Sequence, residues 1–164
     1  MVGFVAYVFD GKRTAAKALD TLEDNVPVYE WIDNIALVSK SKHGHLNIRS
    51  TWAQDDMGAA GFGWGAFTGA LLGMLAGPGG ALAGAALGGS MGGMMGVTAD
   101  IAFDDPALDD FTNSLTKDTS ALVLAGDDDV LADYEGVVGP LGGKLIKTNL
   151  NEDDVKKIKK ALKD

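Results

Sequence analysis

The stretch GFGWGAFTGALLGMLAGPGGALAGAALGGSMGGMMG, residues 61–96, dominates the chain and decides how it is organised. Its glycines recur every four residues in two successive runs. Residues four apart stack on one face of a helix, so each run leaves a strip of backbone that another helix can approach closely. Glycine costs a helix on the order of 1 kcal/mol relative to alanine, so glycines in such register predict close helix packing. The predicted association residues are Gly61, Gly65, Gly69, Gly73 and Gly77 in the first run and Gly80, Gly84, Gly88, Gly92 and Gly96 in the second.

The glycine runs lie in an uncharged segment, since no Asp, Glu, Lys, Arg or His occurs from Met57 to Ala99. Pro78, followed by two glycines, interrupts this segment near its middle, which predicts a helical hairpin with arms at about 60–77 and 80–98. At a rise of about 1.5 Å per residue, each arm is roughly 27–29 Å long, close to the roughly 30 Å of a bilayer's hydrocarbon core. The length of the arms therefore permits insertion into a membrane.

The composition of the hairpin weakens the argument for insertion. Its arms are mostly Gly and Ala, whereas lone transmembrane helices draw on Leu, Ile, Phe and Val. Aspartates flank it at 55–56 on one side and at 100, 104 and 105 on the other, and no nearby Lys or Arg is placed to contact anionic head groups. Insertion would require the hairpins to pair with each other. The larger side chains lie off the glycine stripe, where lipid, the globular part of the chain or a second subunit could cover them.

The rest of the chain reads as an α+β fold, ferredoxin-like or a related α/β sandwich, interrupted by the glycine-zipper hairpin. Residues 1–56 and 100–164 are expected to form one globular domain, with 57–99 as the inserted hairpin. The apolar patterns and turn signals predict the following elements: strands at 3–9, 31–39, 45–52, 120–125 and 144–148, and helices at 12–22, 106–115, 127–137 and after Asn151.

Charge and composition restrict the partners and the compartment. The net charge of −9 argues against general nucleic-acid binding, which needs basic groups to neutralise phosphates. The chain has no cysteine, so disulfides and thiol chemistry are excluded. The N-terminal MVGFVAYVF lacks the basic start of a signal peptide and reads as a strand, which predicts a cytoplasmic protein that is not secreted. With an inserted hairpin, every Lys and Arg would lie on the side that carries both termini, as the positive-inside rule requires at the inner face of a membrane.

Several smaller patterns favour structural roles. His43 and His45 flank a glycine in a predicted turn, but no third metal ligand lies near them in sequence. The acidic run 127–129 matches the dipole at a helix start, and the methionines at 91, 94 and 95 suit packing beside glycine. The lysine-rich helix face at 156–163 reads as a solvated surface, with contact to anionic head groups as its alternative. No catalytic constellation is present, so we expect no enzyme, cofactor or metal centre.

Nearly the full length of the chain resembles the domain-of-unknown-function 1269 family, whose members are commonly labelled predicted membrane proteins. The resemblance is carried by VAYVFDGKRTAAKALDTL at 5–22, by IDNIALVSKSKHGHLNIRS at 32–50, by the glycine-rich hairpin, and by SALVLAGDDDVLADYEGVVGPLGGKLIKTNLNEDD at 120–154. It implies the architecture and the membrane label, and it implies no activity for particular residues.

Three functions follow as expectations. The first is a non-enzymatic, homo-oligomerising, membrane-associated protein that inserts and pairs its hairpins and leaves acidic globular domains in the cytoplasm, so that its partners are itself and a lipid bilayer. The second is a water-soluble homo-oligomer, a ring, cage or filament, whose hairpins form an enclosed helical layer. The third is a small-molecule or metal-binding module with the sheet as its platform.

Overall fold

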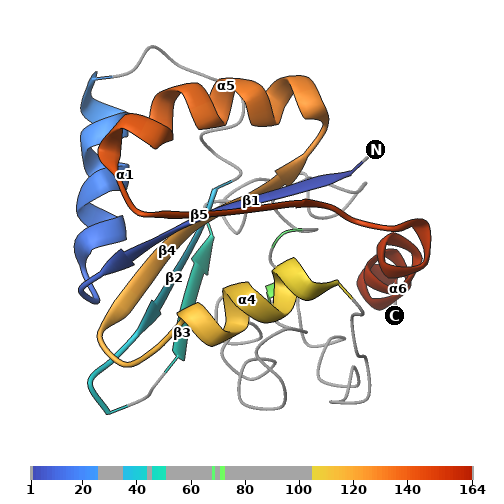
Figure 1. Cartoon of the computed structure of the whole chain (residues 1–164), viewed down its shortest axis with the longest axis horizontal. Coiled ribbons are helices and arrows are strands. Elements are labelled where there is room, and N and C mark those ends of the chain that lie inside the picture. The colour runs from blue at the N-terminus through green and yellow to red at the C-terminus, as the bar shows by residue number, and fades with distance from the viewer. Residues whose placement is uncertain are drawn as a thin grey trace.

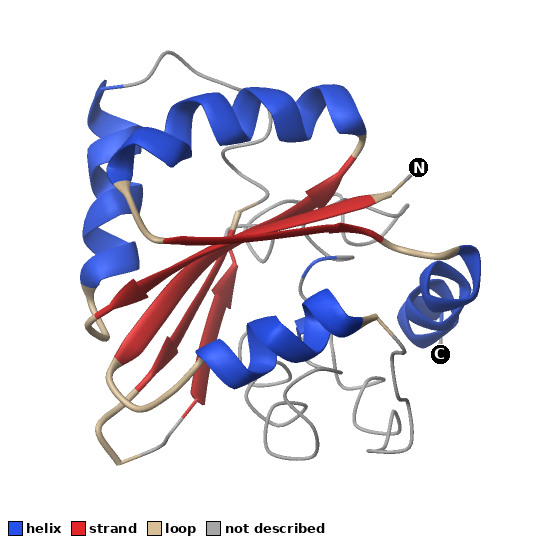
Figure 2. Cartoon of the chain, in the orientation of Figure 1, coloured by secondary structure: helices blue, strands red, loops and turns tan. Residues whose placement is uncertain are grey.

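The computed structural model describes residues 2–25, 35–43, 46–50, 68, 71–72 and 105–163. These residues form a five-stranded antiparallel sheet with helices on both of its faces (Figures 1 and 2). The sheet has the order β3-β2-β4-β1-β5, and the predicted α+β class is confirmed. Its strands are β1 (Gly3–Asp10), β2 (Ala36–Lys40), β3 (Leu46–Ser50), β4 (Thr119–Gly126) and β5 (Lys144–Asn149).

Two β-α-β units interleave in this sheet. Helix α1 (Thr14–Asn25) lies between β1 and β2 in the chain. Both strands are antiparallel to β4, so β1 and β2 run in the same direction on either side of β4. Helix α5 (Asp128–Val138) lies between β4 and β5 in the chain, and these two strands run in the same direction on either side of β1. Strands from before and after the glycine-rich segment therefore pair directly in one sheet.

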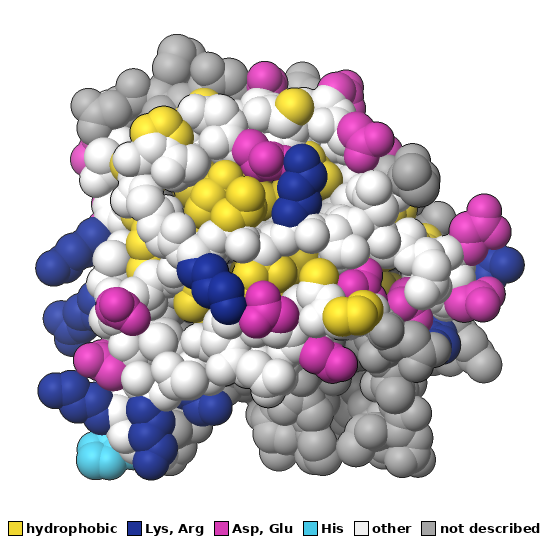
Figure 3. Space-filling model, in the orientation of Figure 1, with side chains coloured by type: hydrophobic (Ala, Val, Ile, Leu, Met, Phe, Trp, Pro, Cys, Tyr) yellow, Lys and Arg dark blue, Asp and Glu magenta, His cyan; other side chains and the backbone are white. Residues whose placement is uncertain are grey.

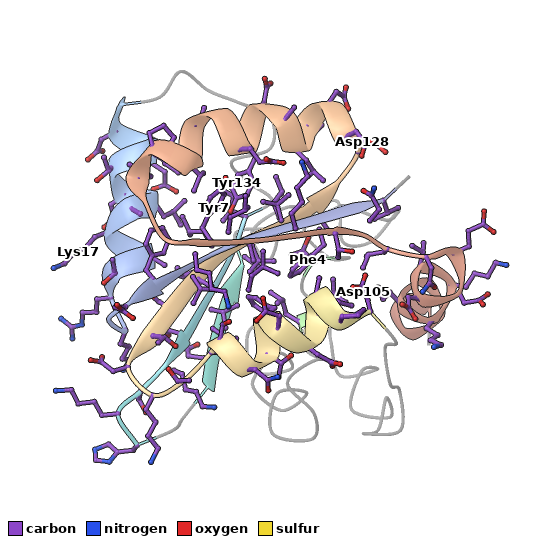
Figure 4. All side chains as sticks on the ribbon, in the orientation of Figure 1. Phe4, Tyr7, Lys17, Asp105, Asp128 and Tyr134 are labelled. Atoms are coloured by element: carbon purple, nitrogen blue, oxygen red, sulfur yellow. The ribbon has the colours of Figure 1, made fainter. Side chains whose placement is uncertain are left out.

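Both faces of the sheet are covered, which explains the continuous apolar runs in β1 and β4. On one face, Val5, Tyr7 and Phe9 of β1 pack under α1 and α5. On the other face, Phe4 and Ala6 pack against α4 (Pro106–Ser114) and against Ile158 of α6 (Glu152–Lys163). Figure 4 shows Tyr7 and Phe4 on opposite sides of the sheet.

The element boundaries agree with the sequence-based expectations to within a few residues, and the differences have local causes. Helix α1 starts at Thr14 instead of residue 12 because Gly11 adopts a φ of +97° and turns the chain out of β1. Strand β2 starts at Ala36, while 31–34 lie outside the described residues. The predicted cap at Asn151 is confirmed, since its Oδ1 accepts the Asp154 N–H at 2.8 Å. The 3₁₀ helix η5 (Gly139–Leu141) follows α5 directly and was not expected.

A pair of tyrosines lies between α5 and the sheet. The rings of Tyr7 and Tyr134 meet edge to face with centroids 5.7 Å apart, and the Tyr134 hydroxyl donates to the Leu122 carbonyl at 2.9 Å. Burial, and then the neighbouring Tyr7, raises the pKa of Tyr134 well above its ordinary value of 10.0. Burial, and then the Glu135 carboxylate, also raises the pKa of Tyr7. The folded state thus holds both phenol protons more tightly than the unfolded chain does.

We expect these raised pKa values to make stability fall at alkaline pH. A raised folded-state pKa contributes stability that is complete below the unfolded value and is lost as the pH rises through the folded value. Urea unfolding measured at a series of pH values should show a declining free energy of unfolding above about pH 10. Tyr134→Phe should lower stability by about 1 kcal/mol at neutral pH through the lost hydrogen bond, and it should flatten the alkaline decline. An equally steep decline in this variant would contradict the assignment.

Candidate functional site

Three residues of the glycine-rich segment are described, and they pack into the core of the domain. Thr68, Leu71 and Leu72 are helical, and their spacing places them on one helix face. The relative exposure of each is 2% or less. Both leucines belong to the same buried cluster as Phe4 of β1 and Phe111 of α4. The glycine-rich segment therefore contacts the sheet through these three residues.

A hydrogen bond fixes this contact to the backbone of β4. The first residue of β2, Ala36, pairs with Val123, so the last residues of β4 extend beyond the edge that β2 covers. At this point the Ala125 N–H donates to Thr68 Oγ1 at 3.2 Å. A buried N–H without a partner costs on the order of 1–3 kcal/mol. The Thr68 hydroxyl thus accepts the hydrogen bond of a β4 amide that lies beyond the end of β2.

This contact answers one question that the sequence left open. Lipid, the globular part and a second subunit were the three surfaces that could cover the larger side chains of the hairpin. For Leu71 and Leu72, the covering surface is the sheet of the same chain. The ten predicted association glycines and the rest of both arms lie outside the described residues. Among the helices in the described ranges, none combines the length and hydrophobicity that crossing a membrane requires.

A second feature is a solvent-open hollow of about 500 Å³ at one end of the sheet, between the start of α1 and the turn after β2. Cationic side chains from both segments line it, and all are exposed. Figure 3 shows Lys and Arg side chains and a histidine along this edge of the molecule, and Figure 4 shows Lys17 pointing outward from α1. We call this site the basic hollow; its lining residues are Gly11, Lys12, Arg13, Thr14, Lys17, Ser41, Lys42, His43 and Asp118.

Asp118 holds the loops around the basic hollow together. Its carbonyl accepts the Gly11 N–H at 2.8 Å, and its Oδ1 accepts the Lys12 N–H at 3.1 Å. Its own N–H donates to the Ser41 carbonyl at 3.4 Å. Its φ of 59° lies in the left-handed region, which Asp tolerates better than most residues. One residue before β4 therefore connects the loop before α1 with the turn after β2.

Ser120 completes the same junction from inside the protein. Its buried hydroxyl accepts the Ala15 N–H at 2.9 Å and donates to the Gly11 carbonyl at 2.6 Å. The Thr14 N–H donates to the Gly11 carbonyl as well. Several backbone donors at the start of α1 are thus already bonded within the protein. What the basic hollow presents to a ligand is mainly its cationic side chains.

Only some residues of the smaller predicted sites lie within the described part of the chain. His43 lines the basic hollow, whereas His45 lies outside the described residues, as do the methionines. The aspartates at 127–129 are exposed at the start of α5, where Figure 4 labels Asp128. Within the described parts of the chain, no three His, Asp or Glu side chains are grouped as metal ligands. In α6, Ile158 is buried as expected for its inner face.

Sequence reasoning did not find the basic hollow. Lys12, Arg13 and Lys17 are close in sequence, and Arg13 and Lys17 share a helix-like spacing that was an available signal. Lys42 joins them only because β2 is placed next to β4, which in turn pairs with β1. That arrangement is a long-range property of the sheet.

The comparisons with known proteins give one match. The model of a family described as "Protein of unknown function (DUF1269)" matches residues 63–163, which is more than half of the chain, and the chain belongs to this family. The matched range begins in the glycine-rich segment and includes α4, β4, α5 and β5. Neither the curated proteins nor the solved structures yielded a match.

The docked segment makes a direct prediction about stability. Leu71→Ala should lower the free energy of unfolding by about 2–5 kcal/mol because it opens a cavity in the core. Thr68→Val should cost about 1–3 kcal/mol because it leaves the Ala125 N–H without its acceptor. Leu145→Ala is the matched control, since this leucine is 47% exposed and should change stability little. Urea unfolding checks all three variants; a Leu71→Ala variant as stable as the control would contradict the docking.

Proposed function

We propose that this member of the DUF1269 family is a non-enzymatic homo-oligomer that assembles through the glycine stripes of its hairpin, with the first arm held on the sheet of its own subunit. The observation that supports this proposal is the docked face formed by Thr68, Leu71 and Leu72. A helix fixed at its middle to a rigid sheet presents its other faces in a defined direction. Such pre-organisation lowers the entropy lost on association.

Helix geometry indicates which glycines would be available for assembly. At about 100° per residue, a continuous helix would place Gly69 roughly 100° and Gly73 roughly 140° around the axis from Thr68. Gly61, by the same reckoning, would lie only roughly 20° from it. The stripe would thus turn from the sheet-facing side at its start to the opposite side at Gly77. The later glycines of the first run are the ones that we expect another helix to contact.

The sequence leaves two environments open for this assembly. In the first, the hairpins insert into a bilayer from its inner face and the acidic domains stay in the cytoplasm. In the second, the assembly is water-soluble and the hairpins form an enclosed helical layer. The docked segment favours the second, because a bilayer span needs roughly 20 residues free of the globular domain and the predicted arm 60–77 is held to the sheet near its centre.

The proposed core fold is ferredoxin-like, with β3 as an added edge strand. Support comes from the interleaved β-α-β units formed around the central strands β1 and β4. In this view α4, α6 and the docked segment are additions that cover the second face of the sheet. The hairpin would then be an insertion anchored to a stable platform.

Bulk placed on both glycine stripes should break the assembly. We expect Gly69→Leu combined with Gly88→Leu to reduce the particle toward the 17.0 kDa of one chain while the domain keeps its fold, because leucine side chains prevent close backbone contact. Size-exclusion chromatography with light scattering measures the particle, and circular dichroism checks the fold. Phe67→Trp combined with Ala86→Leu is the matched control, since on continuous helices Phe67 lies roughly 160° from Gly69 and Ala86 roughly 160° from Gly88, so both changes add bulk off the stripes.

Unchanged size in the stripe variant, or equal loss of size in the control, would reject the stripes as the assembly surface. Ultracentrifugation of a lysate without detergent then separates the two environments. A large soluble particle supports the enclosed layer. Protein confined to the membrane pellet and released only by detergent supports insertion.

A further inference from the structure

We infer that the basic hollow binds a small anion that carries phosphate groups. The hollow gathers Lys12, Arg13, Lys17 and Lys42, with His43 beside them, on a chain whose net charge is −9. One carboxylate, that of Asp118, lines the hollow with them. Like charges brought together repel one another, and an anion seated among them relieves that repulsion. The inference does not depend on the proposed assembly.

The ion pairs of the protein point to the same conclusion. Elsewhere in the described residues, Lys144, Lys147 and Lys157 each contact a carboxylate within the fold, at 3.0, 2.6 and 3.3 Å. No described carboxylate forms an ion pair with the cations of the basic hollow. The chain has 23 acidic residues, so acidic partners are abundant in its composition. These cations instead line the solvent-open hollow.

The hollow has room for a small ligand. Its volume of about 500 Å³ lies within the range of roughly 300–1,000 Å³ that small-molecule sites occupy. Cations line it both from the start of α1 and from the turn after β2, so positive charge from two separate segments borders one hollow. Arginine supplies a planar fork that pairs with two phosphate oxygens, and lysines supply point charges.

The hydrogen bonds of Asp118 explain how the cations are positioned. Asp118 ties the Gly11 and Lys12 amides and the Ser41 carbonyl to one residue, so the two cationic segments are held at a fixed separation. Because the Lys12 N–H is already bonded to this carboxylate, the ligand is held mainly by side chains. Binding should therefore be strongly screened by salt, as expected for exposed charges.

The phosphate group that binds the hollow can belong to two kinds of molecule, a free phosphate compound or a lipid with a phosphate head group. Inorganic pyrophosphate, measured by calorimetry with the full-length protein, probes the first source. Cosedimentation with vesicles of phosphatidylcholine and phosphatidylglycerol, against vesicles of phosphatidylcholine alone, probes the second. Binding in either measurement that weakens with added salt supports the inference. Absence of binding in both overturns it.

Variants locate the binding on the protein. Arg13→Gln, Lys17→Gln and Lys42→Gln combined should weaken binding about tenfold or more, because they remove three charges near the anion. The matched control replaces Lys156, Lys159 and Lys160 of α6 by Gln, which changes the net charge by the same amount. The control should bind like the natural protein. Equal weakening in both variants would mean attraction to overall charge or to α6, and it would overturn the inference. Circular dichroism checks that both variants fold. We expect the hollow variant to fold because its three replaced side chains are exposed.

Discussion

The sheet of this protein is apolar on both faces, and the rest of the structure depends on covering both. Strands β1 and β4 are buried almost from end to end, so neither face can be left to water. The connecting helices α1 and α5 cover one face. On the other, α4 and α6 are joined by Leu71 and Leu72 from the glycine-rich segment. Each buried leucine contributes on the order of 1.5–3 kcal/mol, so the segment that looks separable in the sequence is part of what stabilises the domain.

This constraint changes how the glycine runs are understood. In isolation, an uncharged Gly-rich hairpin suggests a membrane insertion unit. With Thr68 bonded to Ala125 and two leucines in the core, the proposed first arm would have a packed side as well as a glycine side. The two sides would serve different contacts, one within the subunit and one between helices. The basic hollow lies at another part of the molecule, at the start of α1.

The local elements could be predicted because their signals are local. The apolar run at 3–9, the glycines at 142–143 and the cap at Asn151 each determine the structure of their own neighbourhood. The docking of Leu71 could not be predicted, since its hydrophobicity suits lipid, sheet and subunit contacts equally. The basic hollow was missed for a related reason: Lys42 approaches α1 only after β4 has been inserted between β1 and β2. Asp118, which fixes that approach, belongs to no motif in the sequence.

The central claim, that the glycine-rich segment is held on the sheet of its own chain, is tested most directly by cross-linking. The chain has no cysteine, so Thr68→Cys combined with Ala125→Cys introduces a single pair at a site where a side chain and a backbone now meet at 3.2 Å. Thr68→Cys with Ala121→Cys is the control, displaced along the same face of β4 by four residues, about 13 Å. Under oxidation, the first pair should form a disulfide within one chain and the control should not. Absence of the link, or a link that appears only between chains, would contradict the account.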